Sequence, residues 1–307
     1  PDIIRLGTWR PVESSKDLFQ VWGIRQNDHW YALNRHGQPW GAKLNNFEPT
    51  KVWHLLKLDK LMPASYTRKL LNDALPASRT KIDDAIKVLT DASLDTDSGK
   101  VVNLLLGDNS SQGRGKLLTH LNEVKNDISK VTPDNFILDT AQSDSIASLN
   151  PIWYKKWVGA TPKDAAQQKF MRIYSHNFNQ QFRTEGYSHN VLADDIVHEL
   201  FHGAPDTKDL SYAGLPTSGR QGNYQRLDVA PLINLASGHG RDRVTQEVID
   251  KAGAFNNADS FALTTSLLSQ LSKDPVMYRR NIETMSKALE RNNGYIGWEV
   301  LVELNPV

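Results

Sequence analysis

The spacing of two histidines around a glutamate constrains this chain more than any other feature. Residues 191–212 read VLADDIVHELFHGAPDTKDLSY, and His198, Glu199 and His202 form the pattern His-Glu-x-x-His. Residues four apart lie on the same face of an α-helix, so both imidazoles can reach one point. Two neutral nitrogen ligands beside a carboxylate base form the arrangement of a zinc hydrolase. We therefore expect a metal-binding helix with Glu199 as the general base.

The rest of this helix should anchor it in the protein. Asp194 and Asp195 suit the positive end of a helix, so we expect them near its N-terminus. The plainer alternative is a helix whose histidines are ordinary surface or core residues. His176 and His189 are spare metal candidates, but neither has ligand-type spacing, and a solvated or hydrogen-bonded histidine explains each more simply. The apolar surface for burial comes from Ile196, Val197, Leu200 and Phe201.

Catalytic zinc usually has three protein ligands, so the residues after His202 decide the class of site. A metzincin needs glycine and histidine where this chain has Pro205 and Lys208. Two carboxylates stay open as the third ligand. Glu247 would come from a later helix, whereas Asp209 would be reached by a short loop that folds back. Tyr212 follows Asp209 closely enough to donate its phenol hydrogen bond to a developing oxyanion.

Two motifs carry a resemblance to a known family. His-Glu-x-x-His followed by Thr-x-Asp-x-x-Tyr, at residues 198–212, resembles the aspzincins, the group of deuterolysin and peptidyl-Lys metalloendopeptidase. Residues 257–261, Asn-Ala-Asp-Ser-Phe, resemble the Asn-Ala-Asp-Ser-Tyr element of that group. The likeness runs, with decreasing clarity, from about residue 64 to the C-terminus. This chain has Asp206 where the family has glycine, a shorter spacer before Asp209 and a longer stretch between the two motifs.

The resemblance implies a role for each site residue. His198, His202 and Asp209 would bind one Zn²⁺ per chain, with Glu199 as the general base and Tyr212 as the oxyanion donor. Asp259 stands at the start of a predicted helix, where a carboxylate is favoured by the helix dipole. The other interpretation is that Asp259 accepts a hydrogen bond from a zinc-bound histidine. Residues of the substrate pocket do not carry over, because the stretch between the motifs differs.

Patterning predicts an α+β fold in two domains. Residues 1–50 read as a small β-rich module whose tryptophans fill its core, or else form an aromatic face for a ligand such as carbohydrate. Residues 51–307 read as a mainly helical, zincin-like metalloprotease domain with a small edge-stranded sheet. Its helical subdomain covers about 51–133 and its active-site part about 134–307. The edge strand is expected at 171–174, and helices include 66–75, 79–92, 227–236 and 241–252.

Composition limits the partners of the chain. The formal charge is +1 with both signs mixed, so neither nucleic acid nor an anionic membrane is an expected partner. No run of eighteen apolar residues exists, so no membrane span is expected. Cysteine is absent, which excludes disulfides and thiolate zinc ligands. The sequence begins at Pro1 without a signal-like segment, so we expect a processed chain or an excised fragment.

The expected function is a zinc-dependent endopeptidase acting on a protein or peptide substrate. An N-terminal module before a divergent aspzincin core is similar to toxin or effector domains delivered by larger bacterial polypeptides. The expected setting is therefore a secreted or delivered protease toxin, with an inhibitor or immunity protein as a further partner. A secreted nutritional protease is the alternative within the same class. From another class, the chain would be a non-catalytic binding module that keeps the zinc site as structure.

Overall fold

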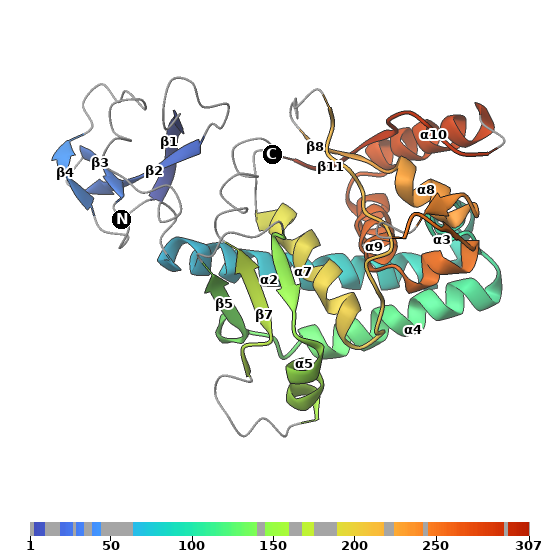
Figure 1. The fold of residues 1–307 in the computed structure, drawn as a ribbon, viewed down its shortest axis with the longest axis horizontal. Coiled ribbons are helices and arrows are strands. Elements are labelled where there is room, and N and C mark those ends of the chain that lie inside the picture. Colours follow the sequence, from blue (N-terminus) through green and yellow to red (C-terminus); the bar gives the residue numbers. More distant parts are fainter. Residues whose placement is uncertain are drawn as a thin grey trace.

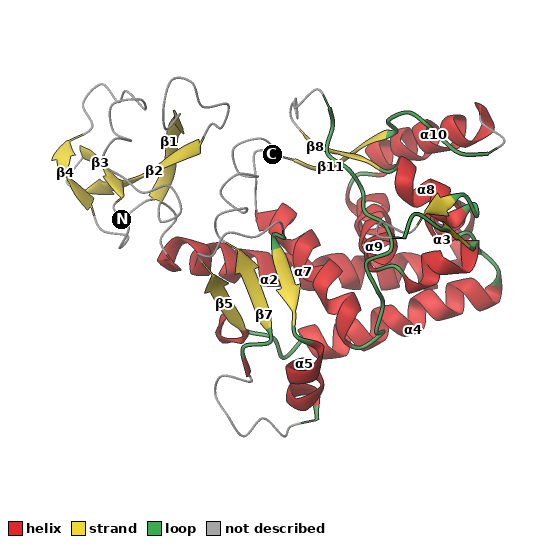
Figure 2. Cartoon of the chain, viewed as in Figure 1, coloured by secondary structure: helices red, strands yellow, loops and turns green. Residues whose placement is uncertain are grey.

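The structure is a computed structural model of the 307-residue chain. It describes residues 3–9, 19–26, 29–33, 39–43, 64–139, 145–159, 168–174, 189–217, 224–241, 245–291 and 294–306. Helices dominate these residues and the strands form small sheets (Figure 2), so the predicted α+β class with a mainly helical body is confirmed. No helix within the described ranges is both long and apolar enough to cross a bilayer.

The first fifty residues contain an antiparallel sheet of four strands in the order β1-β2-β3-β4. The side chains of this sheet, tryptophans included, lie outside the described part of the chain. The choice between a packed aromatic core and a ligand-binding face therefore stays a prediction, as does the domain boundary near residue 50. The strands are β1 (Ile3–Trp9), β2 (Phe19–Gln26), β3 (His29–Leu33) and β4 (Pro39–Lys43).

Helix α9 (Ala258–Lys273) lies at the centre of the helical body and packs against α2, α3, α7 and α10 (Figure 1). Its burial is compatible with its many hydroxyl residues because these have hydrogen-bond partners, either within the helix or, as for Ser266 and Ser269, on carboxylates of neighbouring helices. Thr264 and Thr265, for example, each donate to a carbonyl one turn earlier, at 2.7 Å. The other helices are α2 (Ala64–Thr90), α3 (Asp95–Leu106), α4 (Ser111–Ile128), α5 (Pro151–Val158), α7 (His189–Gly203), α8 (Ala230–Ala236) and α10 (Pro275–Arg291), with short 3₁₀ turns η3 (Ala92–Leu94), η4 (Pro133–Asn135) and η6 (Lys251–Asn256).

A single long helix, α2, replaces the two helices expected at 66–75 and 79–92. It continues through Pro76, although proline removes one backbone hydrogen bond and disfavours a helix interior. The apolar residues on both sides of Pro76, Leu71 and Ile82 among them, are buried in the same core. Burial of one continuous stripe therefore outweighs the local loss.

In the sheet nearest to α7, the strand predicted to lie at the edge lies in the middle. β7 (Met171–Tyr174) lies in the middle of the order β5-β7-β6, parallel to β5 (Phe136–Asp139) and antiparallel to β6 (Ala147–Leu149). The prediction that 171–174 is an edge strand is therefore wrong, because both edges of β7 are paired. The three-residue strand β6 lies at the edge instead, and it contacts α7.

Two further strand pairs lie in the C-terminal half, and they replace part of the predicted helices. The described residues of 241–252 contribute to an antiparallel strand pair and to the start of η6, so only the final two are helical. Gln246 has a φ of 59°, a left-handed conformation that stops a helix, and Val248 is exposed, so no apolar stripe is buried. The expected helix at 227–236 begins only at α8. The pairs are β8 (Tyr224–Asp228) with β11 (Leu301–Pro306), and β9 (Gly240–Arg241) with β10 (Val248–Ile249).

Asp194 fixes α7 to three other elements. Because α7 begins at His189, Asp194 and Asp195 lie in its second turn, and their expected place at the N-terminus is wrong. The Asp194 carboxylate forms an ion pair with Lys81 of α2 and accepts from Ser266 of α9. It also accepts from Asn305 of β11 at 2.6 Å. The side chains of Lys81 and Asp194 are only 10% and 17% exposed, so this network is largely shielded from water.

Removing the cation of this network should destabilise the fold. We expect Lys81→Met to lower the free energy of unfolding by about 3 kcal/mol, because it leaves a shielded carboxylate without its cation. Urea unfolding measures the loss. The matched control is Lys125→Met, which breaks the half-exposed pair with Asp83 and should lower it by less than about 1 kcal/mol. Equal losses would contradict the special role of Lys81.

Candidate metal centre

The C-terminal half of α7 presents the two motif histidines on one face. Val197, Leu200 and Phe201 are buried in the core, which leaves the histidine face toward an opening. The Nε2 atoms of His198 and His202 are 3.3 Å apart, and the two rings meet edge to face. The four-residue spacing thus brings both imidazoles to one point.

The carboxylate of Asp209 completes a triangle with these imidazoles. Its Oδ1 lies 3.1 Å from His198 Nε2 and 3.0 Å from His202 Nε2. Ligand atoms placed 2.0–2.1 Å from a tetrahedral zinc ion lie about 3.3 Å from one another. The three atoms therefore have separations close to those of three corners of a zinc tetrahedron. Within the described residues, this is the one group of three metal-ligating side chains that comes together.

The loop after α7 turns sharply enough to bring Asp209 back to the helix. Asp206 has a φ of 57°, in the left-handed region where glycine is most common and which aspartate tolerates. Thr207 then anchors the turn, because its Oγ1 donates to Phe201 O at 2.7 Å and its backbone N–H bonds to the same carbonyl at 3.1 Å. Asp206 therefore adopts the backbone conformation for which a glycine would otherwise be expected.

The outer nitrogen of each histidine is held by an acceptor. His202 Nδ1 donates to the Thr207 carbonyl at 2.7 Å, and His198 Nδ1 lies 3.0 Å from Asp259 Oδ1. A carbonyl or a carboxylate accepts, so each Nδ1 carries a proton and Nε2 is the nitrogen that faces Asp209. These acceptors thus orient both rings with Nε2 toward the point where a metal ion would bind.

Asp259 contacts more than its own helix. Its second oxygen, Oδ2, accepts from the backbone N–H of Ala213 at 2.7 Å. The carboxylate therefore joins the first turn of α9 to His198 and to the residue after Tyr212. Two interpretations of Asp259 were open, a helix-dipole residue and a partner of a histidine. The structure places its side chain at hydrogen-bond distance from His198.

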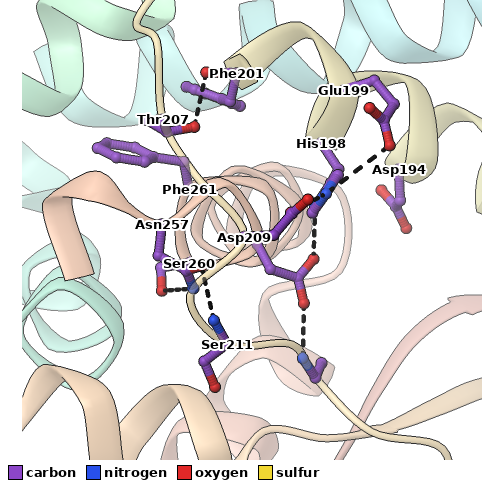
Figure 3. Close-up of polar contacts among 12 residues, drawn as sticks. Asp194, His198, Glu199, Phe201, Thr207, Asp209, Ser211, Asn257, Ser260 and Phe261 are labelled. Carbon is purple, nitrogen blue, oxygen red and sulfur yellow. Dashed lines mark hydrogen bonds and ion pairs between the residues drawn. The ribbon is translucent and has the colours of Figure 1, made fainter. Parts of the chain in front are cut away.

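Glu199 projects into a cavity of about 400 Å³ beside the three ligand atoms. Its Oε1 lies 3.9 Å from His198 Nε2 (Figure 3). Burial raises the pKa of Glu199 to about 7, although the two neighbouring imidazoles lower it. A carboxyl group with a pKa near neutrality can both take up and release a proton at this position.

The ring of Tyr212 lies over His198, with the ring centroids 5.7 Å apart and the planes inclined by 26°. Tyr212 and Glu199 line the same cavity, together with apolar residues of several elements. The chain segment just before β6 and the first residue of β6 also line it, through Ile146 and Ala147. Strand β6 therefore lies beside the cavity as its edge strand, the place where the sequence analysis expected residues 171–174.

Two of the alternative ligands lie apart from this cluster, and the third is not described. Glu247 is exposed on the segment before β10, and it is not part of the cluster. His189 is exposed at the first residue of α7. His176 lies outside the described residues. Asp209 is therefore the carboxylate that the fold brings to the two motif histidines.

Some contacts of the site were not anticipated. The carbonyl that orients His202 belongs to the backbone of Thr207, and every residue type has such a carbonyl. Asn257 contacts the loop after Asp209, and its only sequence signal was its place in the second motif. Strand β6 has three residues, too few for an alternating pattern to be recognised.

Hydrogen bonds within the cluster favour the protonated form of its two histidines. Burial lowers the pKa of His198, but its bonds to Asp209 and Asp259 outweigh burial and raise that pKa well above 6.5. Burial also lowers the pKa of His202, but the hydrogen bond to Asp209 raises it, and the net change is a rise. The same bonds lower the pKa of Asp209 against the effect of burial. A metal ion therefore competes with protons for this site.

We expect zinc binding to release protons and to weaken as the pH falls. Imidazoles with raised pKa values are protonated below those values, so affinity should rise from about pH 6 to about pH 8. Calorimetry in buffers of different ionisation enthalpy measures both quantities. His189→Ala, at the exposed start of α7, is the control and should leave them unchanged. Zinc binding without proton release would contradict the histidine ligands.

Comparisons with protein-family models, with curated proteins and with solved structures found no match for this chain. The likeness to the aspzincins is therefore a likeness of two short motifs, at residues 198–212 and 257–261. The chemistry of the site has to be inferred from the positions of His198, His202, Asp209 and their neighbours.

Proposed function

We propose that this chain is a zinc-dependent endopeptidase of the aspzincin type, with one zinc ion held by His198, His202 and Asp209. The observation that carries the proposal is the mutual separation of the three ligand atoms, 3.0, 3.1 and 3.3 Å. Oriented imidazoles and an oxygen ligand suit zinc, which binds nitrogen and carboxylate donors in tetrahedral sites. When bound, zinc supplies a Lewis acid and lowers the pKa of a coordinated water toward about 7.

Glu199 is the proposed general base. It accepts a proton from the attacking water as the water oxygen bonds to the peptide carbonyl carbon, and it delivers that proton to the amine when the C–N bond breaks. Its place in the cavity, beside His198, suits both transfers. A carboxylate in this position is not needed merely to hold a metal ion.

Tyr212 is the proposed hydrogen-bond donor to the oxygen that gains charge during the attack. Its ring lies against His198 and lines the cavity that Glu199 also lines. Contact with a ligand histidine keeps the phenol on the side of the site where the carbonyl would lie.

An extended peptide is the proposed substrate. Among the described strands, β6 pairs with β7 alone, and an edge strand can add a further strand through its backbone groups. Ile146 and Ala147 place this strand at the wall of the cavity. We propose that the chain belongs to a secreted or delivered toxin, because its sequence predicts an N-terminal module before an aspzincin-like core.

Glu199→Gln tests the chemistry separately from metal binding. We expect the variant to keep its zinc but to lose about 10²–10⁴-fold in turnover, because the amide cannot accept the proton. Casein digestion with and without a chelator, together with metal analysis, measures both. Glu247→Gln, at an exposed position, is the control. Normal cleavage by the Glu199 variant would refute the mechanism, and zinc without chelator-sensitive cleavage in the wild type would favour a binding module.

Asp209→Ala tests the third ligand. Loss of a residue that only orients a ligand lowers metal affinity about 10–100-fold, so loss of a ligand itself should lower zinc affinity by more than about 100-fold. Competition with a chromophoric chelator measures the change. Glu247→Ala removes the alternative carboxylate and should leave affinity unchanged. If Glu247→Ala lowered zinc affinity and Asp209→Ala did not, Glu247 would be the third ligand instead.

A further inference from the structure

Packing does not hold the Asp209 side chain, which is 39% exposed. Its position depends on the backbone on both sides. On one side, Lys208 N donates to Asn256 O and Ala258 N donates to Lys208 O, both at 2.9 Å. These bonds fix the residue before Asp209 and do not involve the backbone after it.

The two backbone N–H groups directly after Asp209 are both held by one side chain, that of Asn257. Asn257 is fully buried, and its Oδ1 accepts from the N–H groups of Leu210 at 3.0 Å and Ser211 at 3.1 Å. Its Nδ2 donates to Ser260 Oγ at 2.9 Å, which fixes the orientation of the amide. Figure 3 shows Asn257 and Ser260 beside the loop that carries Asp209.

Asn257 occupies the N-cap of α9, where an asparagine side chain ordinarily accepts from its own helix. Here it makes no such bond and is directed to the loop instead. Two residues later, Asp259 holds His198. The first turn of α9 therefore sets both a histidine ligand and the carboxylate ligand, which come from separate parts of the chain.

We propose that Asn257 is a positioning residue that places the Asp209 carboxylate at the metal centre. This inference depends on the proposed zinc site and adds a residue that acts on it without touching the ion. With Oδ1 in place, Leu210 and Ser211 are anchored to a buried point, so the carboxylate is pre-organised against the two imidazoles. Without it, two shielded N–H groups lose their acceptor and the loop pivots about Lys208.

A double-mutant cycle tests this role. We expect Asn257→Ala to lower zinc affinity about 10–100-fold when Asp209 is present. In the Asp209→Ala background the same change should lower it less than about 3-fold, because no carboxylate remains to be placed. Chelator competition measures the four affinities, and the visible spectrum of the cobalt-substituted protein reports the ligand geometry. Asn257→Ser is measured in parallel as a milder truncation whose hydroxyl can hold a water molecule.

The control for general destabilisation is Asn234→Ala. Asn234 is also a buried asparagine that clamps a loop, since it bonds to the N–H and the carbonyl of Ile296 at 2.7 and 3.0 Å. It should lower the melting temperature while leaving zinc affinity and the cobalt spectrum unchanged. Equal losses of affinity in both Asp209 backgrounds, or no loss with Asn257→Ala and Asn257→Ser, would overturn the positioning role. A wild-type protein without zinc affinity would instead refute the proposed function, and the positioning role with it.

Discussion

The packing of α7 against the first turns of α9 determines the geometry of the whole metal centre. Phe201, which stands between the two motif histidines, stacks on Phe261, with ring centroids 5.1 Å apart and planes inclined by 16°. Both rings are completely buried, so the two helices have a fixed register. Asp259 lies two residues before Phe261 and reaches His198 only in this register. An apolar contact behind the site therefore sets the polar contact within it.

The sequence predicted the features that depend on spacing along one element. The four-residue interval of His198 and His202 on a helix is sufficient to place both side chains on one face. Asp209 was one of two open carboxylates, because spacing alone does not say how a loop folds back. The deciding physical feature is the left-handed turn at Asp206, which reverses the chain.

Features that depend on partners distant in sequence were missed or predicted wrongly. The continuous helix through Pro76 is favoured by a core that no local propensity describes. β7 has the expected residues of a strand, but its place in the middle of the sheet depends on β6, a strand of three residues. Asn257 reads locally as a helix cap, yet its side chain bonds to residues 46 and 47 positions earlier.

The closure of the network around Asp194 has a consequence for biosynthesis. Asn305 bonds to Asp194 across 111 residues and to Lys81 across 224 residues. A ribosome that has made Asp194 must therefore add 111 more residues before Asn305 of β11 can dock against the motif helix. Throughout this interval the nascent chain holds the motif helix without the strand that completes its support. The Asp194 carboxylate therefore gains its last partner only after almost every other described element has been made.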